Sequence, residues 1–560
     1  MSADFLRRRS NALNLCQDQV REISYNDLLL SLDNEFKRHG KSNEAFGIPM
    51  PELLQDVAHI EDPADYDPDA AAYFDANHPL LNEEQLQIFD TIANDIDTGV
   101  GSLHTFDAFG GSGKTFLSNI LLSYVRKLNK VARATAYSGI AATLLRLGRT
   151  FHREFKVPIP SYDDSCSSMK LDSEEAESIR IASLIMVDEV SMMHWNQLEL
   201  LDKLLRELMK NGEYMGGKCV VLMGDLRQCP PVVTGNSSRA AIVAASVVNS
   251  EVWGHFTKHH LTKNMRVERL INADPSRAGK LKIYADWLLK LGDGKLPAVC
   301  RDRAVCRDMI EIPTQMVCQS HQELEDKVYD NFSENMQNAK YLYERAIMSS
   351  TNNTIQERNY EFIKRLPGEI EISLSRDSCI ESDDHCLYDP EHLNKINVSG
   401  IPPHRLALKK GACIILIKNL DIRNGHCNGT RYITEGLTKN LIKARKLSGG
   451  PNSTIVIPKI PNIANDSAFP VPFKRIQFPV LLAYYLTINR AQGQTLQRAG
   501  LYLPKSVFCH GHLYVGFGRC GDPDKFFVYA DQTEFDNLKE WLQDNKFYTR
   551  NIVYSELLGK

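Results

Sequence analysis

The chain has 560 residues, of which 43% are hydrophobic and 24% charged, and its formal net charge is −4 at pH 7. This composition is ordinary for a globular protein, and the length predicts about three or four domains. No apolar run approaches the ~20 residues that a membrane-spanning helix needs, and the first residues lack the apolar core of a secretory signal. We therefore expect a soluble, intracellular protein without a membrane partner, in the nucleus rather than the mitochondrion if its source is eukaryotic.

The first 80 residues are predicted to form an extension ahead of the first domain. Residues 1–50 carry a partly helical leucine stripe, and the following stretch to about residue 80 is rich in Asp and Pro. Residues 51–90 contain eleven Asp or Glu and no Lys or Arg. We interpret this stretch as a linker or an acidic surface strap.

The strongest local signal is a glycine-rich segment between a strand-like run, Leu103–Asp107, and an amphipathic helix. Backbone N–H groups of such a loop, together with the partial positive charge of the helix N-terminus, bind phosphate. We predict a nucleotide triphosphate site in which Lys114 reaches the β- and γ-phosphates and Thr115 ligates Mg²⁺. Ala108 stands where the usual motif has its first glycine. The residues expected to surround the nucleotide are Gly110, Gly111, Ser112, Gly113, Lys114, Thr115 and Phe116.

Upstream of this loop, Leu81–Gln85 predicts a helix start. The Gln85 amide offers a donor and an acceptor that can read an adenine ring, although a purely structural role fits equally well.

Acidic and amide residues follow the next predicted strands. The apolar run Leu184–Val187 ends in Asp188 and Glu189, which predicts a Mg²⁺ ligand and a residue that polarises the attacking water. The run Cys219–Met223 leads to Gln228, a candidate sensor of the γ-phosphate. An earlier strand, Ala132–Tyr137, leads into the small and hydroxyl residues 138–142. Arg266 lies in a polar segment, where an ordinary surface arginine is the alternative.

The second half of the chain predicts another α/β unit that begins near Ala346–Met348. Within it, residues 405–446 carry ten basic and two acidic side chains, which favours either a local phosphate-binding surface or a solvated face. Strand candidates 414–417 and 431–433, with Asn-Gly turns between them, predict a small β insertion. Leu481–Ile488 and Phe526–Tyr529 are further predicted strands. Thirteen cysteines without a C-x-x-C pair predict reduced thiols.

The order of these motifs resembles the PIF-one-type (petite integration frequency) DNA helicases, and most closely the helicase part of Helitron transposons. The resemblance runs from about residue 80 to the end. It rests on segments 107–116, 138–142 with 148–152, 187–192, 224–228 with 230–232, 416–430 and 486–495. The family commonly has alanine at position 108.

The resemblance implies an α/β fold with two RecA-like P-loop domains, each with a parallel sheet, and a small β-barrel inserted in the second. We place the N-terminal extension at 1–80, the first domain at 81–275, the second at 276–560 and the insertion at about 400–470. The implied activity is ATP- and Mg²⁺-dependent, 5′-to-3′ translocation on single-stranded DNA with unwinding of tailed duplexes, by a monomeric or weakly self-associating chain. The implied processes are DNA repair, recombination, telomere maintenance or transposon replication.

The resemblance also assigns roles by matching position. Gln85 would read adenine, and Lys114, Thr115, Asp188, Glu189 and Gln228 would serve as described above. Arg266 and Arg519 would be the arginine fingers, and His152 and Thr487 would contact DNA. The basic stretch adds Lys409 and Lys410 as candidate DNA contacts.

The last family motif, commonly Ala-Leu-Ser-Arg, here reads Gly516-Phe517-Gly518-Arg519, and Arg490 replaces a common lysine. The two glycines predict a loop with more conformational freedom. Two alternatives therefore stay open: a degenerate, Helitron-derived ATPase that binds nucleic acid without unwinding it, and a P-loop ATPase with other mechanical work.

Overall fold

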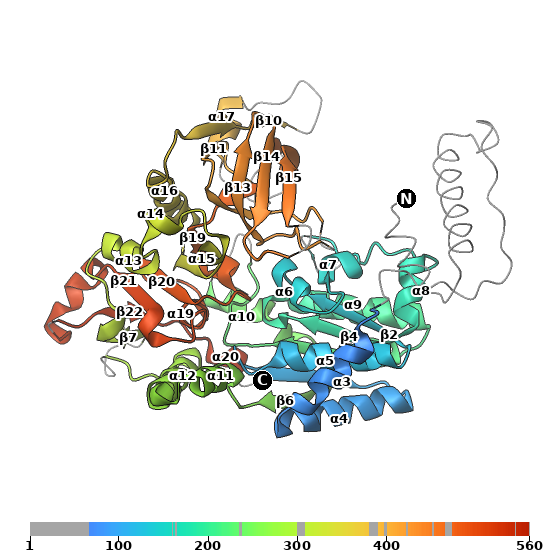
Figure 1. Ribbon diagram of the computed structural model, residues 1–560. Helices are drawn as coiled ribbons and strands as arrows, with labels where there is room; N and C mark the ends of the chain where they lie inside the picture. Colours follow the sequence, from blue (N-terminus) through green and yellow to red (C-terminus); the bar gives the residue numbers. More distant parts are fainter. Residues whose placement is uncertain are drawn as a thin grey trace, which may run out of the picture.

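The computed structural model describes residues 67–558, apart from gaps at 160, 163–164, 234–237, 300–307, 380–389, 397–399, 422–423, 451–452, 465–472 and 544. The predicted helical stripe of residues 1–50 lies outside the described residues. Two parallel sheets and a group of antiparallel strands make up three lobes (Figure 1).

The first lobe is a six-stranded, all-parallel sheet in the order β3-β2-β4-β5-β1-β6. Its strands are β1 Leu103–Ala108, β2 Val131–Ala136, β3 Arg149–Thr150, β4 Ala182–Asp188, β5 Val220–Gly224 and β6 Thr257–Leu261. Its helices are α3 Ala70–Asn77, α4 Glu83–Thr98, α5 Lys114–Lys127, α6 Gly139–Leu144, α7 Phe151–Glu154, α8 Glu174–Arg180, α9 Trp195–Met209 and α10 Arg239–Ala245.

Strand β4 shows why the sheet is covered on both faces. Leu184 and Met186 pack with the residues of α4 and α5, whereas Ile185 and Val187 pack with those of α8 and α9. Successive side chains of a strand point to opposite faces, so a continuous apolar run is what a doubly covered strand requires.

Residues 67–80 pack on the first lobe, which contradicts the linker alternative for this part of the acidic stretch. Residues 70–77 form α3, and the Phe74 ring lies 5.5 Å from that of Tyr124 on α5. Asp67 accepts hydrogen bonds at 2.7 and 2.6 Å from the Arg146 guanidinium. The alanines at 70–72 are strong helix formers, and the acidic composition around them concealed this.

The second lobe is a four-stranded parallel sheet in the order β19-β8-β20-β21. Its strands are β8 Arg345–Ser349, β19 Tyr485–Thr487, β20 Arg498–Leu503 and β21 Phe526–Ala530, and a separate antiparallel pair joins β7 Met309–Glu311 to β22 Tyr548–Arg550. Its helices are α13 His321–Val328, α14 Phe332–Asn335, α15 Ala339–Tyr343, α16 Asn352–Ile363, α18 Ile488–Ala491 and α19 His512–Phe517. Helices α11 Met265–Ala273 and α12 Ala278–Gly292 lead from the first sheet to the second.

An antiparallel insertion lies between β8 and β19, which confirms the predicted architecture. Its strands begin at 371 and end at 482, so they extend beyond the predicted window of 400–470. They are β9 Glu371–Leu374, β10 Arg376–Cys379, β11 Arg405–Leu408, β12 Cys413–Leu416, β13 Arg431–Leu437, β14 Leu441–Lys446, β15 Thr454–Pro458, β16 Ile460–Ala464, β17 Phe473–Gln477 and β18 Val480–Leu482, with α17 Pro390–Lys395. The predicted single strand 481–488 is wrong, because β18 pairs with β12 in the insertion whereas β19 pairs with β8 in the parallel sheet.

The C-terminal stretch returns to the first lobe after β22. Tyr554 and Leu557 are buried among side chains of α9 and β5, and α20 Ser555–Leu558 is seen beside the first lobe in Figure 1. The Arg239 guanidinium pairs with Glu556 at 2.8 Å. The two lobes are therefore joined twice, through α11 and α12 and through this return.

Candidate active site

The glycine-rich loop joins β1 to α5 as predicted. Gly111 and Gly113 have φ of +99° and +87°, a left-handed conformation that glycine adopts without strain. A Cβ at Gly111 would lie 3.0 Å from Asn264 Oδ1, and one at Gly113 would lie 2.6 Å from Gln85 Nε2. Both glycines are therefore required by backbone conformation and by close neighbours. Ala108 is fully buried at the end of β1.

Asp188 and Glu189 lie at the C-terminal end of β4, beside the loop. Lys114 Nζ is 3.5 Å from Asp188 Oδ1, and the Glu189 N–H donates to the same oxygen at 2.7 Å. Glu189 has φ of +60°, a strained backbone position for a residue with a side chain. Its carboxylate accepts a hydrogen bond from Ser138 Oγ at 2.5 Å.

The electrostatics of this group follow from its burial. Burial disfavours the charge of Lys114, but attraction to Asp188, Asp225 and Glu189 outweighs it and raises the lysine pKa. Burial, together with repulsion from Asp188, raises the pKa of Glu189. A buried carboxylate with a raised pKa beside a lysine of a glycine-rich loop is typical of a group that handles a proton.

Gln85 is buried against the loop, but both ends of its amide bind protein. Its side chain accepts from the Asn82 N–H at 3.2 Å and donates to the Ser112 carbonyl at 3.3 Å. The bond from the Asn82 N–H completes a capping box at the start of α4. Adenine recognition by Gln85 stays a prediction.

Gln228 belongs to a buried polar network that sequence reasoning missed. Gln228 Nε2 donates to Asp225 Oδ2 at 3.1 Å, and the Tyr514 hydroxyl donates to the same oxygen at 2.7 Å. The Gly110 N–H of the loop donates to the Tyr514 hydroxyl at 3.4 Å. Arg227 extends the network to Asp107 at 3.3 Å and Asp293 at 2.7 Å. Tyr514 on α19 thus links the second lobe to the phosphate loop.

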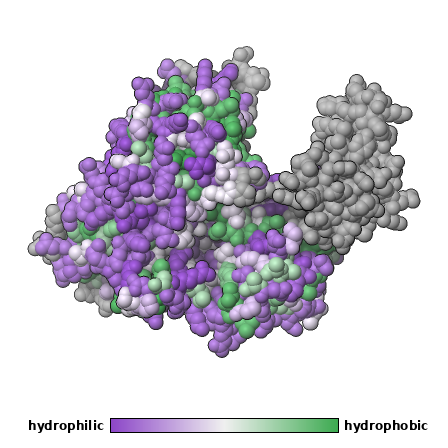
Figure 2. Space-filling model, in the orientation of Figure 1, coloured by the Kyte–Doolittle hydropathy of each residue, from purple (hydrophilic) through white to green (hydrophobic). Residues whose placement is uncertain are grey.

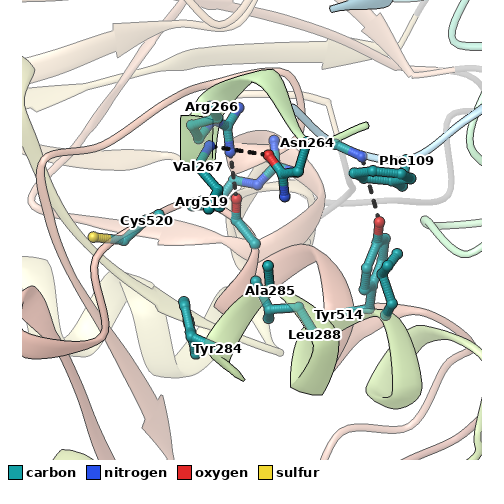
Figure 3. Close-up of a pocket in the computed structure, with 14 residues that line it drawn as sticks. Phe109, Asn264, Arg266, Val267, Tyr284, Ala285, Leu288, Tyr514, Arg519 and Cys520 are labelled. Atoms are coloured by element: carbon teal, nitrogen blue, oxygen red, sulfur yellow. Dashed lines mark hydrogen bonds between the residues drawn. The ribbon is translucent and has the colours of Figure 1, made fainter. Parts of the chain in front are cut away.

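The two predicted arginine fingers converge on a pocket between the lobes (Figure 3). Arg266 Nη1 donates to the Gly518 carbonyl at 3.0 Å, and its backbone N–H donates to the Gly111 carbonyl at 3.2 Å. Arg519 donates to the Val515 carbonyl at 2.9 Å and the Gln494 carbonyl at 3.2 Å. Burial, reinforced by repulsion from Arg266, lowers the pKa of Arg519 to about 10.

The glycines of the last motif are packed, which corrects the prediction of a loosened loop. A Cβ at Gly516 would lie 2.8 Å from Leu501 Cδ2, and one at Gly518 would lie 2.8 Å from the Tyr514 carbonyl oxygen. Neither glycine has a positive φ. These positions are small because α19 packs closely, and the same packing holds Arg519 in place.

The candidate DNA contacts His152 and Thr487 are both largely engaged with the protein. Burial lowers the pKa of His152 to about 4, and its ring lies 5.0 Å from that of Tyr137. Thr487 caps α18, where its hydroxyl accepts from the Arg490 N–H at 3.2 Å.

The basic stretch at 405–446 was predicted to be either a local phosphate-binding surface or a solvated face, and several of its side chains are neither. Lys409 is buried and donates to the Leu366 carbonyl at 2.7 Å, so it is not placed to contact DNA. Lys446 is buried as well and donates to the Asn424 carbonyl at 2.8 Å. Arg445 pairs with Glu435 at 2.7 Å, whereas Lys410 is exposed. Backbone carbonyls and one carboxylate therefore account for much of this charge.

The remaining predictions concern cysteines, metal and membrane. Eight cysteines of the described residues are free, but Cys379 is disulfide-bonded, so the prediction of reduced thiols is wrong there. His510 donates to the Leu226 carbonyl at 2.8 Å and accepts from the Tyr554 N–H at 3.0 Å. Within the described ranges no group of three or more His, Cys, Asp or Glu side chains is arranged to hold a metal. Every helix in this part of the chain is too short or too polar to cross a bilayer, and the face in Figure 2 is largely hydrophilic.

Comparison with known proteins finds two family models that match parts of the chain. A model described as PIF1-like helicase matches residues 80–302, and a model of the DNA helicase Pif1 2B domain matches residues 391–437. Over these two parts the chain is similar to PIF1-like helicases. It is distant from its relatives: it is 24% identical over 498 residues to the ATP-dependent DNA helicase PIF1 of Emericella nidulans, covering 77% of this chain and 60% of that protein. The chain is also 23% identical over 581 residues to the ATP-dependent DNA helicase RRM3 of Saccharomyces cerevisiae. This match covers 93% of this chain and 75% of that protein.

The chain also spans only 59% of the length of the PIF1 helicase of Danio rerio, with 22% identity over 78% of this chain. Among solved structures, Pif1 helicase from Candida albicans matches with a TM-score of 0.55 and 21% identity, covering 82% of this chain and 98% of that one. Pif1 from Bacteroides, in complex with ADP-AlF3 and ssDNA, matches with a TM-score of 0.55 and 20% identity. This match covers 84% of this chain and 99% of that one. These likenesses show the PIF1-like fold.

Proposed function

We propose that this PIF1-like chain is an ATP-hydrolysing DNA helicase that moves 5′-to-3′ along single-stranded DNA and unwinds tailed duplexes. One observation carries the proposal: Lys114 and Glu189 of the first lobe lie in the same buried site as Arg519 of the second lobe, near enough that Glu189 and Arg519 shift each other's pKa. A hydrolytic site assembled from two lobes couples turnover to their relative motion, which translocation requires.

The nucleotide would be bound by residues 110–116, with Lys114 neutralising the β- and γ-phosphates. Mg²⁺ would be held by the Thr115 hydroxyl and the Asp188 carboxylate, which are hard oxygen ligands that suit this ion. The position of Asp188, 3.5 Å from Lys114 Nζ, fits a cation shared with the phosphates. When bound, Mg²⁺ supplies charge neutralisation at the phosphates.

The protein's own groups then have distinct tasks in hydrolysis. Glu189 orients the attacking water and accepts its proton as the oxygen bonds to the γ-phosphorus and the bond to the β–γ bridging oxygen breaks. Gln228, through Asp225, senses the γ-phosphate. Arg266 and Arg519 stabilise negative charge in the transition state, an effect typically worth about 10³–10⁵ in rate. Gln85 would read the adenine.

The DNA assignment draws on relatives. The curated relatives above are described as ATP-dependent DNA helicases, and the Bacteroides structure holds single-stranded DNA. Another matched structure concerns unwinding at forked duplex DNA by two coordinating Pif1 helicases. In this chain, exposed Lys410 and partly exposed His152 remain candidate contacts, and Thr487 would act mainly by capping α18.

Finer features belong to the same proposal. We assign the first RecA-like domain to about 81–275, extended by α3, and the second to about 276–560 with the antiparallel insertion. A monomeric or weakly self-associating chain, a Helitron origin, a nuclear location and a role in repair, recombination, telomere maintenance or transposon replication follow from the resemblance alone. The degenerate alternative loses its main argument, because Gly516 and Gly518 are packed.

Strand displacement on duplexes with a 5′ or a 3′ tail tests the proposal. We expect ATP-dependent displacement of the 5′-tailed substrate only. Lys114→Ala should abolish both hydrolysis and displacement, because the lysine offsets the phosphate charge. Displacement of the 3′-tailed duplex would contradict the polarity. Hydrolysis that persists in Lys114→Ala would contradict the site assignment.

A further inference from the structure

The Glu189 carboxylate is oriented by residues outside the phosphate loop. Ser138 Oγ donates to Glu189 Oε2 at 2.5 Å. The other oxygen lies against the second lobe, since a Cβ at Gly493 would be 3.1 Å from Glu189 Oε1. Among the described residues, none of the hydrogen bonds accepted by this carboxylate comes from the loop that would hold phosphate.

Ser138 begins a segment that lies against the insertion. It caps α6, where its hydroxyl accepts from the Ala141 N–H at 3.2 Å. A Cβ at Gly139 would lie 3.1 Å from Asn419 Oδ1, and a Cβ at Gly429 would lie only 2.4 Å from Ile140 Cδ1. Figure 1 shows α6 directly below the strands of the insertion.

Ile140 stands at the junction of all three lobes. Its Cδ1 faces Gly429 of the insertion, and its Cγ2 lies 4.0 Å from the Cβ position of Gly493 in the second lobe. Gly429 has φ of +94° and cannot carry a side chain without strain. A movement of the insertion or the second lobe is therefore transmitted to α6 through direct packing, and from α6 to the Ser138 hydroxyl.

The Ser138–Glu189 bond is strong enough to matter for turnover. An O–H donor to an ionised carboxylate makes a short, charge-assisted bond, about twice as strong as a neutral one. Glu189 is buried, where such a bond is not weakened by competition with water. A carboxylate held in this way has one oxygen less available to accept a proton from water.

We propose that Ser138 is a positioning residue that holds Glu189 away from the attacking water until binding of a DNA strand moves α6 against Gly429 and Gly493. The inference rests on the proposed function, because it assumes hydrolysis that a DNA strand stimulates. It assigns to Ser138 and Ile140 a coupling role distinct from that of the residues that touch nucleotide.

Steady-state ATPase rates with and without single-stranded DNA test this role. Ser138→Ala should raise the DNA-free rate by up to about tenfold and reduce the stimulation by DNA by the same factor, because the carboxylate is freed. Ser138→Thr keeps the hydroxyl and should behave as the parent. Ser173→Ala is the matched control, since Ser173 caps α8 through the same bond, from the Ala176 N–H at 3.2 Å, far from Glu189 in sequence.

The split between kcat and KM separates orientation of Glu189 from a structural role. Ser138→Ala should change the DNA-free kcat and leave KM for ATP unmoved, because the Ser138 hydroxyl binds Glu189 and not the glycine-rich loop. Ser138→Thr should restore the parent kcat, and Ser173→Ala should leave both constants unmoved.

Ile140→Ala tests the link to the insertion with the hydroxyl intact, and it should also raise the DNA-free rate. A parallel fall of the basal and DNA-stimulated rates in Ser138→Ala, or a change in KM for ATP with kcat unmoved, would overturn the inference. If Ser138→Ala raises the DNA-free rate and Ile140→Ala does not, the proposed transmission through Ile140 is contradicted. Glu189→Gln distinguishes a failure of this inference from a failure of the proposed function. If the Glu189→Gln variant still hydrolyses ATP, the proposed function fails, whatever the result for Ser138→Ala.

Discussion

Gly518→Ala is expected to impair the enzyme, although alanine and serine are commonly tolerated in loops. The added Cβ would lie 2.8 Å from the Tyr514 carbonyl oxygen, where ordinary contact begins at 3.4 Å, so the backbone must shift by about 0.6 Å. A backbone oxygen cannot swing aside as a side chain can. The same carbonyl accepts the Gly518 N–H at 2.9 Å, so the shift strains the end of α19.

Two costs add in this variant. Overpacking of this kind typically costs about 1–3 kcal/mol of stability. In addition, the Gly518 carbonyl accepts from Arg266 Nη1 at 3.0 Å, and a hydrogen bond to a charged group is worth about 1.5–3 kcal/mol. If that amount is lost from transition-state stabilisation, kcat falls by about tenfold to a hundredfold.

The assay is kcat for ATP at saturating single-stranded DNA, together with the melting temperature of the variant. Gly279→Ala is the matched control, because α12 leaves nothing within 4 Å of a Cβ there, and alanine should be neutral or slightly stabilising. The reasoning is refuted if Gly518→Ala matches Gly279→Ala in both measurements. A higher DNA-free rate would instead support a loosened loop.

The remaining predictions concern the basic stretch and the half-buried His152. Lys409→Met should lower the free energy of unfolding by about 1–3 kcal/mol, because the Leu366 carbonyl loses its buried donor, and it should leave the salt dependence of DNA binding unchanged. Lys410→Met should leave stability unchanged and reduce the log–log salt slope by about 0.7, and the reverse pattern in the two variants would contradict the assignment. His152, whose pKa burial lowers from 6.5 to about 4, stays neutral in the folded protein while the unfolded chain takes up a proton. Stability should therefore fall by about 2 kcal/mol between pH 7 and about pH 5, and His152→Gln should remove that loss in denaturant titrations; an unchanged pH dependence in the variant would refute it.

The motifs of the proposed nucleotide site were predictable because each is local in sequence. The glycine loop, Asp188 and Gln228 all follow apolar strand runs, and parallel strands bring their C-terminal ends to one edge of the sheet. The antiparallel insertion was predictable in kind from its turns, but not in extent. The break between β18 and β19 at Ala483 and Tyr484 could not be predicted, because an apolar run does not indicate which sheet each half will join.

Long-range contacts explain most of what the sequence did not reveal. Lys409 belongs to a run of basic residues, yet its partner is a carbonyl 43 residues away. Gly516 packs closely against Leu501 on β20. The two glycines of the motif alone predicted conformational freedom, because the sequence does not show this contact. Ser138 was part of a recognised motif, but its bond to Glu189 spans 51 positions.

The double connection between the lobes has a mechanical consequence. The covalent path through α11 and α12 and the return of residues 551–558 form a closed loop of linked bodies. A relative rotation of the lobes must therefore bend the path through α11 and α12 or pull residues 551–558 out of the first lobe. Both connections thus oppose a wide separation of the lobes that hold Glu189 and Arg519.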